Sequence, residues 1–351
     1  EEMTKRFLSQ QMSPGEQLQF IFGEALVRFP ANISGVTTDF KASSADDSMA
    51  PLSSPNWAAQ GDASDIPCWV REVVPSSVDE GFVTHNGVYV KEAVAEHAQL
   101  RTVVVRDARG LDDEALIQHC RDAYEAIFEG IDPASVARIW NYIPGINDLV
   151  VDGQDRYMLF NAGRYSAYQR VMPERESHPV ASGVGHAGSD LVVHLLHGAG
   201  DVLGLRNPKQ CLPHRYSSRY GQLPPAFSRA GLARFGSESW LLVSGTASVI
   251  GEDSCHKGNA AEQLAETICN LERVLNSAQG SVGSPVQFSS STEWLVYTTD
   301  MSFADDIRAG LAASFQANHE KITVRRQPLC RSELMVEIEC ATKIVDFEVA
   351  W

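Results

Sequence analysis

Apolar positions in the first half of the chain follow the periods of strands and helices in turn. Alternation and short apolar runs predict strands over 81–91 and 102–106. An acidic first turn, then apolar residues at helical spacing, predicts a helix from Leu111 to about Phe128. The stretch 135–142 continues as a strand or a short helix and ends in a Pro144-Gly145 turn.

The second half repeats this order. Strands are expected over 240–243, 294–297 and 334–339, with helices over 259–277 and 303–315. A repeated order of strand, helix and strand predicts an α+β protein of two related lobes. Each lobe should be a mixed sheet with helices packed on one face.

Four parts are expected along the chain. Residues 1–65 should be irregular, because the stretch 42–65 is rich in Ser, Asp, Ala and Pro. Residues 66–150 should form the N-terminal lobe and residues 236–351 the C-terminal lobe. Between them, 151–235 is interpreted as a connector that contributes binding residues, since such residues concentrate on connecting segments.

Charge and cysteine content narrow the possible partners and compartment. The 351 residues include 29 basic and 45 acidic side chains, a net charge of −16, which disfavours binding to nucleic acids or anionic membranes. We find no apolar run long enough to span a bilayer and no basic-then-apolar signal pattern at the start. Seven cysteines without a C-x-x-C pair favour reduced thiols, and therefore the cytoplasm.

Two motifs match cofactor or metal patterns only by their letters. Residues 183–188 read G-x-G-x-x-G, but a polar stretch precedes them and the strand-like Leu191–Val193 follows, so a dinucleotide loop is not expected. His194 and His197 could share a helix face, yet no carboxylate or cysteine stands in register with them. We expect neither a cofactor nor a metal.

The last predicted strand carries three carboxylates on one face. With a period of two, Glu333, Glu337 and Glu339 point one way, while the intervening apolar residues point the other. An acidic, solvated face on an edge strand would explain this pattern. A carboxylate site would also explain it, but the pattern alone favours the solvated face and leaves both open.

The final third of the chain resembles the RidA/YjgF family. The resemblance rests on Ser244-Gly245 at a strand end, on Gln263 and Asn270-Leu271 in a helix, and on the terminal Val336-Glu337-Ile338-Glu339. It implies that Glu337 faces a ligand pocket. Arg331 is the nearest equivalent of the family's usual arginine, in a different local sequence.

Longer motifs narrow the resemblance to the chorismatases. These motifs are Arg138–Asn147 (Arg-Ile-Trp-Asn-Tyr-Ile-Pro-Gly-Ile-Asn), Phe160–Arg164, Tyr220-Gly221 with Pro225–Ala230, and Ser244–Gly251. The resemblance implies two RidA/YjgF-like lobes with the active site between them. It also implies that the chain is an enzyme of secondary metabolism that acts on chorismate and releases pyruvate.

Chorismate has two carboxylates, so an acidic protein needs dedicated arginines to bind it. The candidates in the matching motifs are Arg164, Arg215 and Arg229, each of which could instead be a surface ion pair. Tyr216 and Tyr220 could donate hydrogen bonds or pack in the core. Gly245, Thr246 and Cys330 complete the expected substrate-binding set.

Glu337 is the expected general acid, because cleavage of the enolpyruvyl ether needs a proton on the methylene carbon and burial can keep a carboxyl group protonated. Glu339 is the alternative acid. Gly245 with Cys330 resembles the subtype that forms 3-hydroxybenzoate, in which the ring hydroxyl is the internal nucleophile. A hydrolase that yields 3,4-dihydroxycyclohexa-1,5-diene carboxylate and a non-catalytic binder of small carboxylates are the alternatives. The two lobes in one chain favour a monomer.

Overall fold

The computed structural model describes residues 17–22, 25–30, 66–74, 80–83, 87–150, 153–173, 178–198, 200–283 and 285–344. The chain divides into two units, 1–59 and 60–351. In the first unit, strands β1 (Gln17–Phe22) and β2 (Ala25–Pro30) form an antiparallel pair. The expectation of an irregular segment over 1–65 is therefore wrong at these strands, where apolar residues recur in Leu18, Phe20, Leu26 and Val27.

The first lobe is a six-stranded sheet with two helices. Its elements are β3 (Glu80–Val83), β4 (Val88–Val94), β5 (Gln99–Val105), α3 (Asp113–Phe128), β6 (Val136–Pro144), α4 (Arg156–Val171), β7 (Ala181–His186) and β8 (Leu191–His197). The strand order is β3-β4-β5-β8-β6-β7, and within it only β6 and β7 run parallel.

The second lobe repeats this topology. Its elements are β9 (Leu203–Leu205), β10 (Ala230–Phe235), β11 (Glu238–Ala247), α5 (Ala260–Val282), β14 (Glu293–Thr298), α6 (Ala304–Phe315), β15 (Ile322–Arg326) and β16 (Val336–Ile344). The order is β9-β10-β11-β16-β14-β15, with β14 and β15 as the parallel pair. Short elements α2 (Val70–Val73), β12 (Val249–Ile250) and β13 (Asp253–Ser254) accompany the two sheets.

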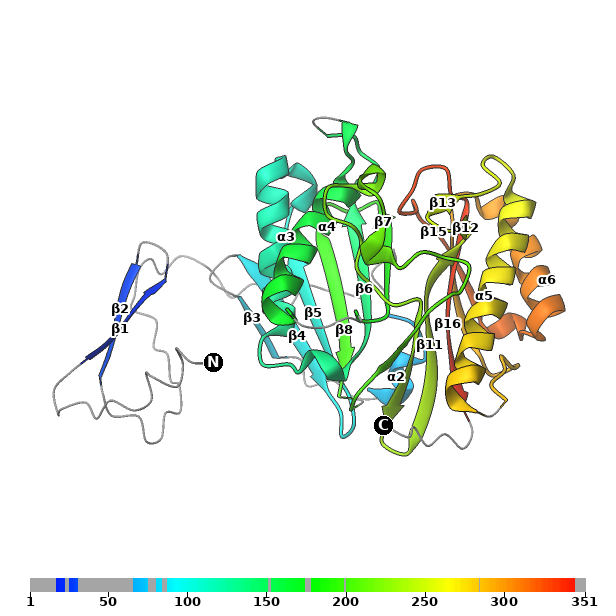
Figure 1. Ribbon diagram of the computed structural model, residues 1–351, viewed down its shortest axis with the longest axis horizontal. Coiled ribbons are helices and arrows are strands. Elements are labelled where there is room, and N and C mark those ends of the chain that lie inside the picture. The colour runs from blue at the N-terminus through cyan, green and yellow to red at the C-terminus, as the bar shows by residue number, and fades with distance from the viewer. Residues whose placement is uncertain are drawn as a thin grey trace. The chain divides into compact units, whose positions relative to one another are not determined.

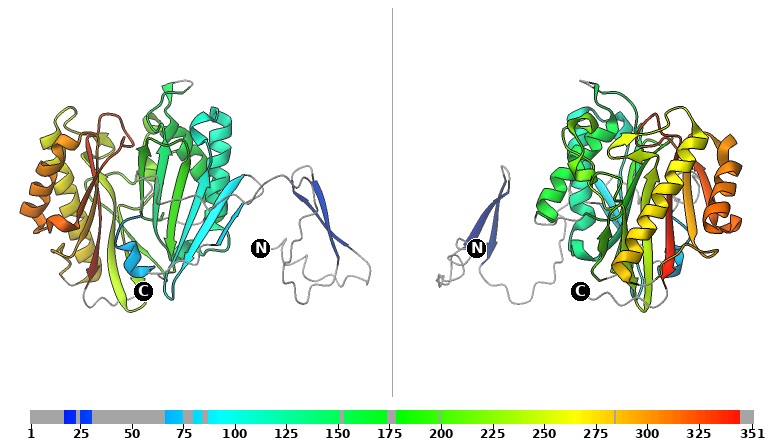
Figure 2. Two further views of the ribbon diagram at one scale, coloured as in Figure 1. Left: turned by 180° about the vertical axis from the view of Figure 1, so that it is seen from behind. Right: turned by 45° about the vertical axis from the view of Figure 1, so that its right-hand side comes forward.

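The layers run helices, sheet, sheet, helices, as Figure 1 and Figure 2 show from several sides. Helices α3 and α4 cover the outer face of the first sheet, and α5 and α6 cover the outer face of the second. Each helix layer and its sheet enclose a separate apolar core. The expected fold class of two mixed sheets, each with helices on one face, is confirmed.

Local signals explain most of the boundaries. The side chains of Asp112 and Asn259 accept hydrogen bonds from the first turns of α3 and α5, so both helices begin next to the predicted positions. The stretch 81–91 divides into β3 and β4, and Gly87 between them has a φ of 73°. The stretch 135–142 is strand β6, and the last strand begins at Val336 instead of Leu334.

The sheets divide the chain differently from the expected connector over 151–235. Helix α4 and strands β7 and β8 complete the first lobe through His197, while β9 and β10 open the second sheet. The stretch joining the lobes is therefore short. The long irregular segment of this region lies inside the second lobe, between Leu205 and Ala230.

The G-x-G-x-x-G match and the pair of His194 and His197 both lie on strands. Gly183 and Gly185 belong to β7, which turns into strand β8 rather than a helix, so a dinucleotide loop is absent there. His194 and His197 both lie on β8, where their odd spacing places them on opposite faces. The part of the chain that the structure describes holds no cluster of three His, Cys, Asp or Glu side chains suited to a metal. Among its helices, none has the length and apolarity to cross a membrane.

Candidate active site between the lobes

The open faces of the two sheets meet at a buried polar cluster. Glu339 of β16 accepts hydrogen bonds from Arg138 Nη2 and Trp140 Nε1 of β6, each at 2.7 Å, and from the Ser182 hydroxyl of β7. Arg138 is 2% exposed and Glu339 3% exposed, so this ion pair is shielded from water. Leaving either charge unpaired would be costly, and the pair links β6 of the first lobe to β16 of the second.

A bulge in β11 forms part of the same junction. The register between β11 and β16 shifts between Val243 and Thr246. At this point the Gly245 N–H donates to Ser182 Oγ at 2.9 Å, and Ser244 Oγ donates to the Ser228 carbonyl and accepts from the Ala181 N–H. The bulge therefore joins the second sheet to β7 of the first lobe.

A cavity opens beside this junction, with a volume of about 80 Å³. Side chains from both lobes line it. They are Asp155, Tyr157 and Met158 at the start of α4; Tyr216, Tyr220, Pro225, Phe227 and Arg229 from the irregular segment before β10; and Gly245, Ala247, Val249, Cys330, Arg331, Leu334 and Glu337.

Glu337 is the buried carboxyl group of this cavity, at 3% exposure. Burial, and next the negative charge of Glu339, raise the pKa of Glu337 from 4.5 to about 8. The Cys330 thiol lies 3.8 Å from Glu337 Oε2, and burial raises its own pKa, so it is a neutral neighbour. The site thus holds a carboxyl group that is protonated at neutral pH.

Gly245 makes room for this carboxyl group. A Cβ at Gly245 would lie 1.9 Å from Glu337 Oε1, far inside van der Waals contact. Any larger residue would push the Glu337 side chain out of its place. Thr246, the next residue, points to the other side of the strand and bonds the Ser244 carbonyl at 2.9 Å.

Two arginines and two tyrosines form one wall. Arg229 is 7% exposed; its Nη2 donates to the Tyr216 hydroxyl at 2.6 Å, while its Nε has no partner. The Arg331 guanidinium lies 3.8 Å from the centre of the Tyr220 ring and donates to the Glu252 carbonyl and Ser254 Oγ. Both arginines therefore place positive charge beside the cavity on aromatic supports.

Tyr216 and Tyr220 lie on a loop that is hydrogen-bonded to the carboxylate of Glu252. Glu252, at the turn between β12 and β13, accepts from the Ser217 N–H at 2.7 Å, from Ser217 Oγ at 2.6 Å and from Arg219 at 2.8 Å. These hydrogen bonds, those of Ser217 first, lower the pKa of Glu252 to about 2. Glu252 therefore remains ionised and holds the loop across the physiological pH range.

The structure brings together most, but not all, of the expected site residues. Glu337, Tyr216, Tyr220, Arg229, Gly245 and Cys330 line the cavity. Glu339 lies beside it in the interlobe ion pair, and Thr246 points away. Arg164 is buried in the first lobe against Asn161 and Phe160, and Arg215 is exposed, so within the described chain neither lines the cavity. A ligand contact of Arg164 or Arg215 stays a prediction.

Sequence reasoning missed the first-lobe wall of the cavity. Asp155 caps α4 by accepting from the Met158 N–H at 2.9 Å, and this turn places Tyr157 and Met158 at the site. The available signal was an aspartate just before a helical pattern, close after the Arg138–Asn147 motif. Arg331 was noticed in the sequence, but its place in the wall was not expected.

Comparisons with known proteins bear on this site. Residues 82–197 match the family described as "Chorismatase FkbO/Hyg5-like, N-terminal", and the match ends where β8 ends. A 3-hydroxybenzoate synthase of Streptomyces hygroscopicus is 30% identical over 230 residues, which cover 62% of this chain and 67% of that protein. A chorismatase of Streptomyces rapamycinicus is 31% identical over 225 residues, with the same coverage of 62% and 67%. The chain belongs to the chorismatase family.

The fold agrees with this membership. A crystal structure of a chorismatase superposes with a TM-score of 0.63 at 23% sequence identity, covering 75% of this chain and 79% of the other. The expected resemblance to chorismatases is therefore confirmed in sequence and in fold.

Proposed function

We propose that this chorismatase-family protein converts chorismate into 3-hydroxybenzoate and pyruvate. The names of its relatives support this substrate. The observation that carries the proposal is a buried carboxyl group, Glu337, which keeps its proton to about pH 8 in a cavity with two arginines. A proton donor and an anion-binding wall are what cleavage of an anionic enol ether needs.

Glu337 is the proposed general acid. It donates its proton to the methylene carbon of the enolpyruvyl group, which turns the ether into an oxocarbenium ion. The bond between the ring and the ether oxygen then breaks, and pyruvate leaves as the keto acid. The neighbouring ring hydroxyl oxygen attacks the vacated ring carbon and gives its proton to the Glu337 carboxylate, so that an epoxide bridges the two ring carbons. Glu337 then protonates the epoxide oxygen as its bond to the carbon that first carried the hydroxyl breaks. The carbon that now carries the oxygen loses its hydrogen as a proton to the Glu337 carboxylate, which restores aromaticity. Chorismate then equals the sum of the two products, with no water and no cofactor consumed.

Arg229 and Arg331 are the proposed partners of the two substrate carboxylates. The Arg229 Nε is buried without a partner, so a carboxylate could accept from it at no loss of an existing bond. Chorismate has 16 non-hydrogen atoms, and a cavity of about 80 Å³ holds roughly six water molecules. Binding should therefore move the loop of Tyr216 and Tyr220 outward.

Gly245 and Cys330 support the 3-hydroxybenzoate outcome over hydrolysis. Gly245 lets the Glu337 carboxyl group lie against β11, and Cys330 covers its other side with a weakly polar thiol. These two contacts leave little room for an attacking water directly beside the Glu337 carboxyl group. Hydrolysis, with water adding to the oxocarbenium carbon, is the alternative reaction of the same site.

The test is incubation of the purified protein with chorismate, without added cofactor, and mass spectrometry of the products. Pyruvate with 3-hydroxybenzoate supports the proposal, and pyruvate with the dihydroxycyclohexadiene carboxylate supports the hydrolytic alternative. Absence of pyruvate would favour a non-catalytic binder of small carboxylates. Glu337→Gln should abolish turnover, whereas Glu333→Gln is the matched control, because Glu333 pairs with Lys257 away from the cavity.

We also propose that the protein acts as a monomer in the cytoplasm. Both walls of the cavity come from one chain, so the chemistry requires no second copy. Light scattering on the active protein tests this, and activity found only in an oligomer would contradict it.

A further inference from the structure

Tyr157 is a half-buried side chain of the active-site cavity that has no role in the reaction steps proposed so far. It follows the Asp155 cap at the start of α4, and its N–H donates to the Ile146 carbonyl at 3.1 Å. Its ring stacks on Phe160 with the ring centres 6.3 Å apart. The ring also lies against Gly183 of β7, where a Cβ would be 3.4 Å from Tyr157 Cε2. Packed neighbours thus hold the hydroxyl at the first-lobe wall.

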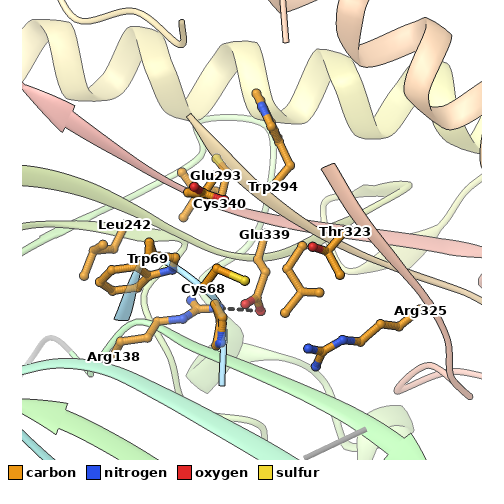
Figure 3. Close-up of a pocket in the computed structure, with 13 residues that line it drawn as sticks. Cys68, Trp69, Arg138, Leu242, Glu293, Trp294, Thr323, Arg325, Glu339 and Cys340 are labelled. Atoms are coloured by element: carbon orange, nitrogen blue, oxygen red, sulfur yellow. Dashed lines mark hydrogen bonds and ion pairs between the residues drawn. The ribbon is translucent and has the colours of Figure 1, made fainter. Parts of the chain in front are cut away.

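Glu337 and Glu339 have different polar neighbours in the first lobe. The Glu339 side chain pairs with Arg138, and Figure 3 shows these two side chains pointing toward one another. Glu337 faces the active-site cavity instead, and Tyr157 lines that cavity from the first lobe. The charge of Glu337, when it is ionised, acts on the Tyr157 hydroxyl. The proposed acid and this hydroxyl therefore border the same small space.

A buried arginine lies behind Tyr157 in the first lobe. Arg164 is 2% exposed, and its Nη2 donates to Asn161 Oδ1 at 2.7 Å. Its guanidinium carbon lies 5.2 Å from the centre of the Phe160 ring, on which Tyr157 stacks. In the part of the chain that the structure describes, its contacts are with an amide and aromatic rings rather than with a carboxylate. A charge is costly to bury in such surroundings, so its retention points to a function beyond packing.

Arg164 and Asn161 polarise the Tyr157 hydroxyl. Burial is the main cause of the raised pKa of Tyr157, whereas the charge of Arg164 and the amide of Asn161 act in the opposite direction. The hydroxyl therefore keeps its proton across the physiological pH range. A hydroxyl polarised by a nearby cation in a buried network is a stronger hydrogen-bond donor than an isolated one.

Chorismate has a ring hydroxyl besides the two carboxylates that the arginine wall would bind. Arg229 and Arg331 are the proposed partners of the carboxylates, which leaves the hydroxyl in need of a partner. This hydroxyl must lie beside Glu337, because it gives its proton to that residue. Tyr157 borders the same space from the opposite lobe, so its hydroxyl is placed to bond the same oxygen.

We propose that Tyr157 donates a hydrogen bond to the oxygen of the ring hydroxyl, and that Arg164, acting through Asn161, is a positioning residue for Tyr157. The bond occupies one lone pair of the oxygen and turns the other toward the vacated ring carbon, while the O–H points at Glu337. Tyr157 keeps its own proton throughout. The inference rests on the proposed function and adds a determinant of its product. Without the bond, attack by the ring hydroxyl slows, and addition of water to the oxocarbenium ion competes.

The first experiment measures the products of Tyr157→Phe by mass spectrometry. Pyruvate should still form, but the ratio of the dihydroxycyclohexadiene carboxylate to 3-hydroxybenzoate should rise about fivefold or more. Tyr165→Phe is the matched control, since Tyr165 lies on the same helix and does not line the cavity. An unchanged ratio in Tyr157→Phe would overturn the inference. If the unaltered protein released no pyruvate, or released it only with the dihydroxycyclohexadiene carboxylate, the proposed function itself would fail.

The second experiment measures binding and needs no turnover. Calorimetry in the Glu337→Gln background compares chorismate with an analogue that lacks the ring hydroxyl. Adding Tyr157→Phe should weaken chorismate binding about fivefold or more and leave binding of the analogue unchanged. Equal weakening of both ligands, or of neither, would refute the contact with the hydroxyl. Absence of chorismate binding in the Glu337→Gln protein would count against the proposed function instead.

A double-mutant cycle tests the role of Arg164. Arg164→Gln should shift the product ratio in the same direction as Tyr157→Phe, and the double variant should shift it no further than Tyr157→Phe alone. Arg170→Gln is the matched control, because Arg170 is an exposed arginine of the same helix that pairs with Glu125. Additive shifts would show that Arg164 does not act through Tyr157. Should Arg164→Gln not fold, Arg164→Lys, which keeps the charge but not the planar donor group, takes its place in the cycle.

Discussion

Glu339→Gln should lower the pH at which the enzyme loses activity. Glu339 is a buried, ion-paired carboxylate two residues from the proposed acid on the same face of β16. Its negative charge is one cause of the raised pKa of Glu337, while Arg138, Arg229 and the Cys330 thiol act in the opposite direction. Gln keeps the size of the side chain and removes its charge, so the pKa of Glu337 must fall.

The magnitude follows from the strand geometry. Residues two apart on a strand are separated by about 6.6 Å. Two unit charges at that distance interact by about 2.5 kcal/mol at an effective dielectric constant of 20, which equals about 1.8 pH units. The basic limb of kcat/KM should move from near pH 8 to near pH 6, and the charge of Arg138, left without its partner, moves it further in the same direction.

The assay is pyruvate release from chorismate between pH 5 and pH 9. Near pH 5 the variant should approach the activity of the unaltered protein, because Glu337 is protonated in both. At pH 7 it should be roughly tenfold slower. Arg138→Gln should move the same limb to higher pH, since a cation is lost. A basic limb that stays in place in Glu339→Gln, or that moves in the same direction in both variants, would refute this electrostatic account. Melting curves at each pH identify any loss of fold.

Three further predictions concern stability, steric fit and substrate binding. Because the pKa of Glu337 is about 8 in the folded protein and near 4.5 in the unfolded chain, the folded state holds an extra proton between these pH values, and the free energy of unfolding falls as pH rises through this window. Glu337→Gln should remove up to about 5 kcal/mol of that fall. Urea unfolding at pH 5 and pH 8.5 tests this, and the same change with pH in the variant and the unaltered protein would count against it. Gly245→Ala should reduce turnover by at least about a hundredfold with the fold retained, since the new Cβ occupies the place of Glu337 Oε1. Turnover near that of the unaltered protein would mean that the carboxyl group acts from another position. Arg229→Lys and Arg331→Lys should each raise KM about tenfold or more, because both guanidinium groups lie at the cavity. Arg170→Lys should leave KM unchanged, because the exposed Arg170 pairs with Glu125 away from the cavity. Steady-state kinetics of the three variants test this, and equal effects would show that the wall is misassigned.

The two-lobe fold could be predicted because its signals are local. Helical spacing located α3 and α5, an acidic first turn marked the start of α3, and the same order of elements in both halves indicated the duplication. Lobe boundaries were harder to predict. Strands β7 and β8 follow α4 in the sequence but pair with β5 and β6, which precede it. The Gly-rich sequence of β7 also resembles a loop.

The proposed acid was recognisable, but its environment was not. Glu337 stands in a strand pattern that also fits a solvated edge, and only the packing of β6 and β7 against β16 shows it buried. The period of two could have separated Thr246 from Gly245, as it separates them in β11. No local pattern could indicate that Arg164 faces Asn161 inside the first lobe, because that depends on how α4 rotates over its sheet.

The duplicated topology has a consequence for stoichiometry. By strand order, β8 occupies in the first lobe the place that β16 occupies in the second, yet its seven residues, Leu191–His197, contain no carboxylate. One half of the molecule thus supplies the proposed proton donor, and the other half supplies Arg138, Trp140 and Ser182, which hold the neighbouring Glu339. Although its two halves are similar, the chain is therefore expected to have one active site. A titration with a tight inhibitor of that site should reach its end point at one equivalent per chain.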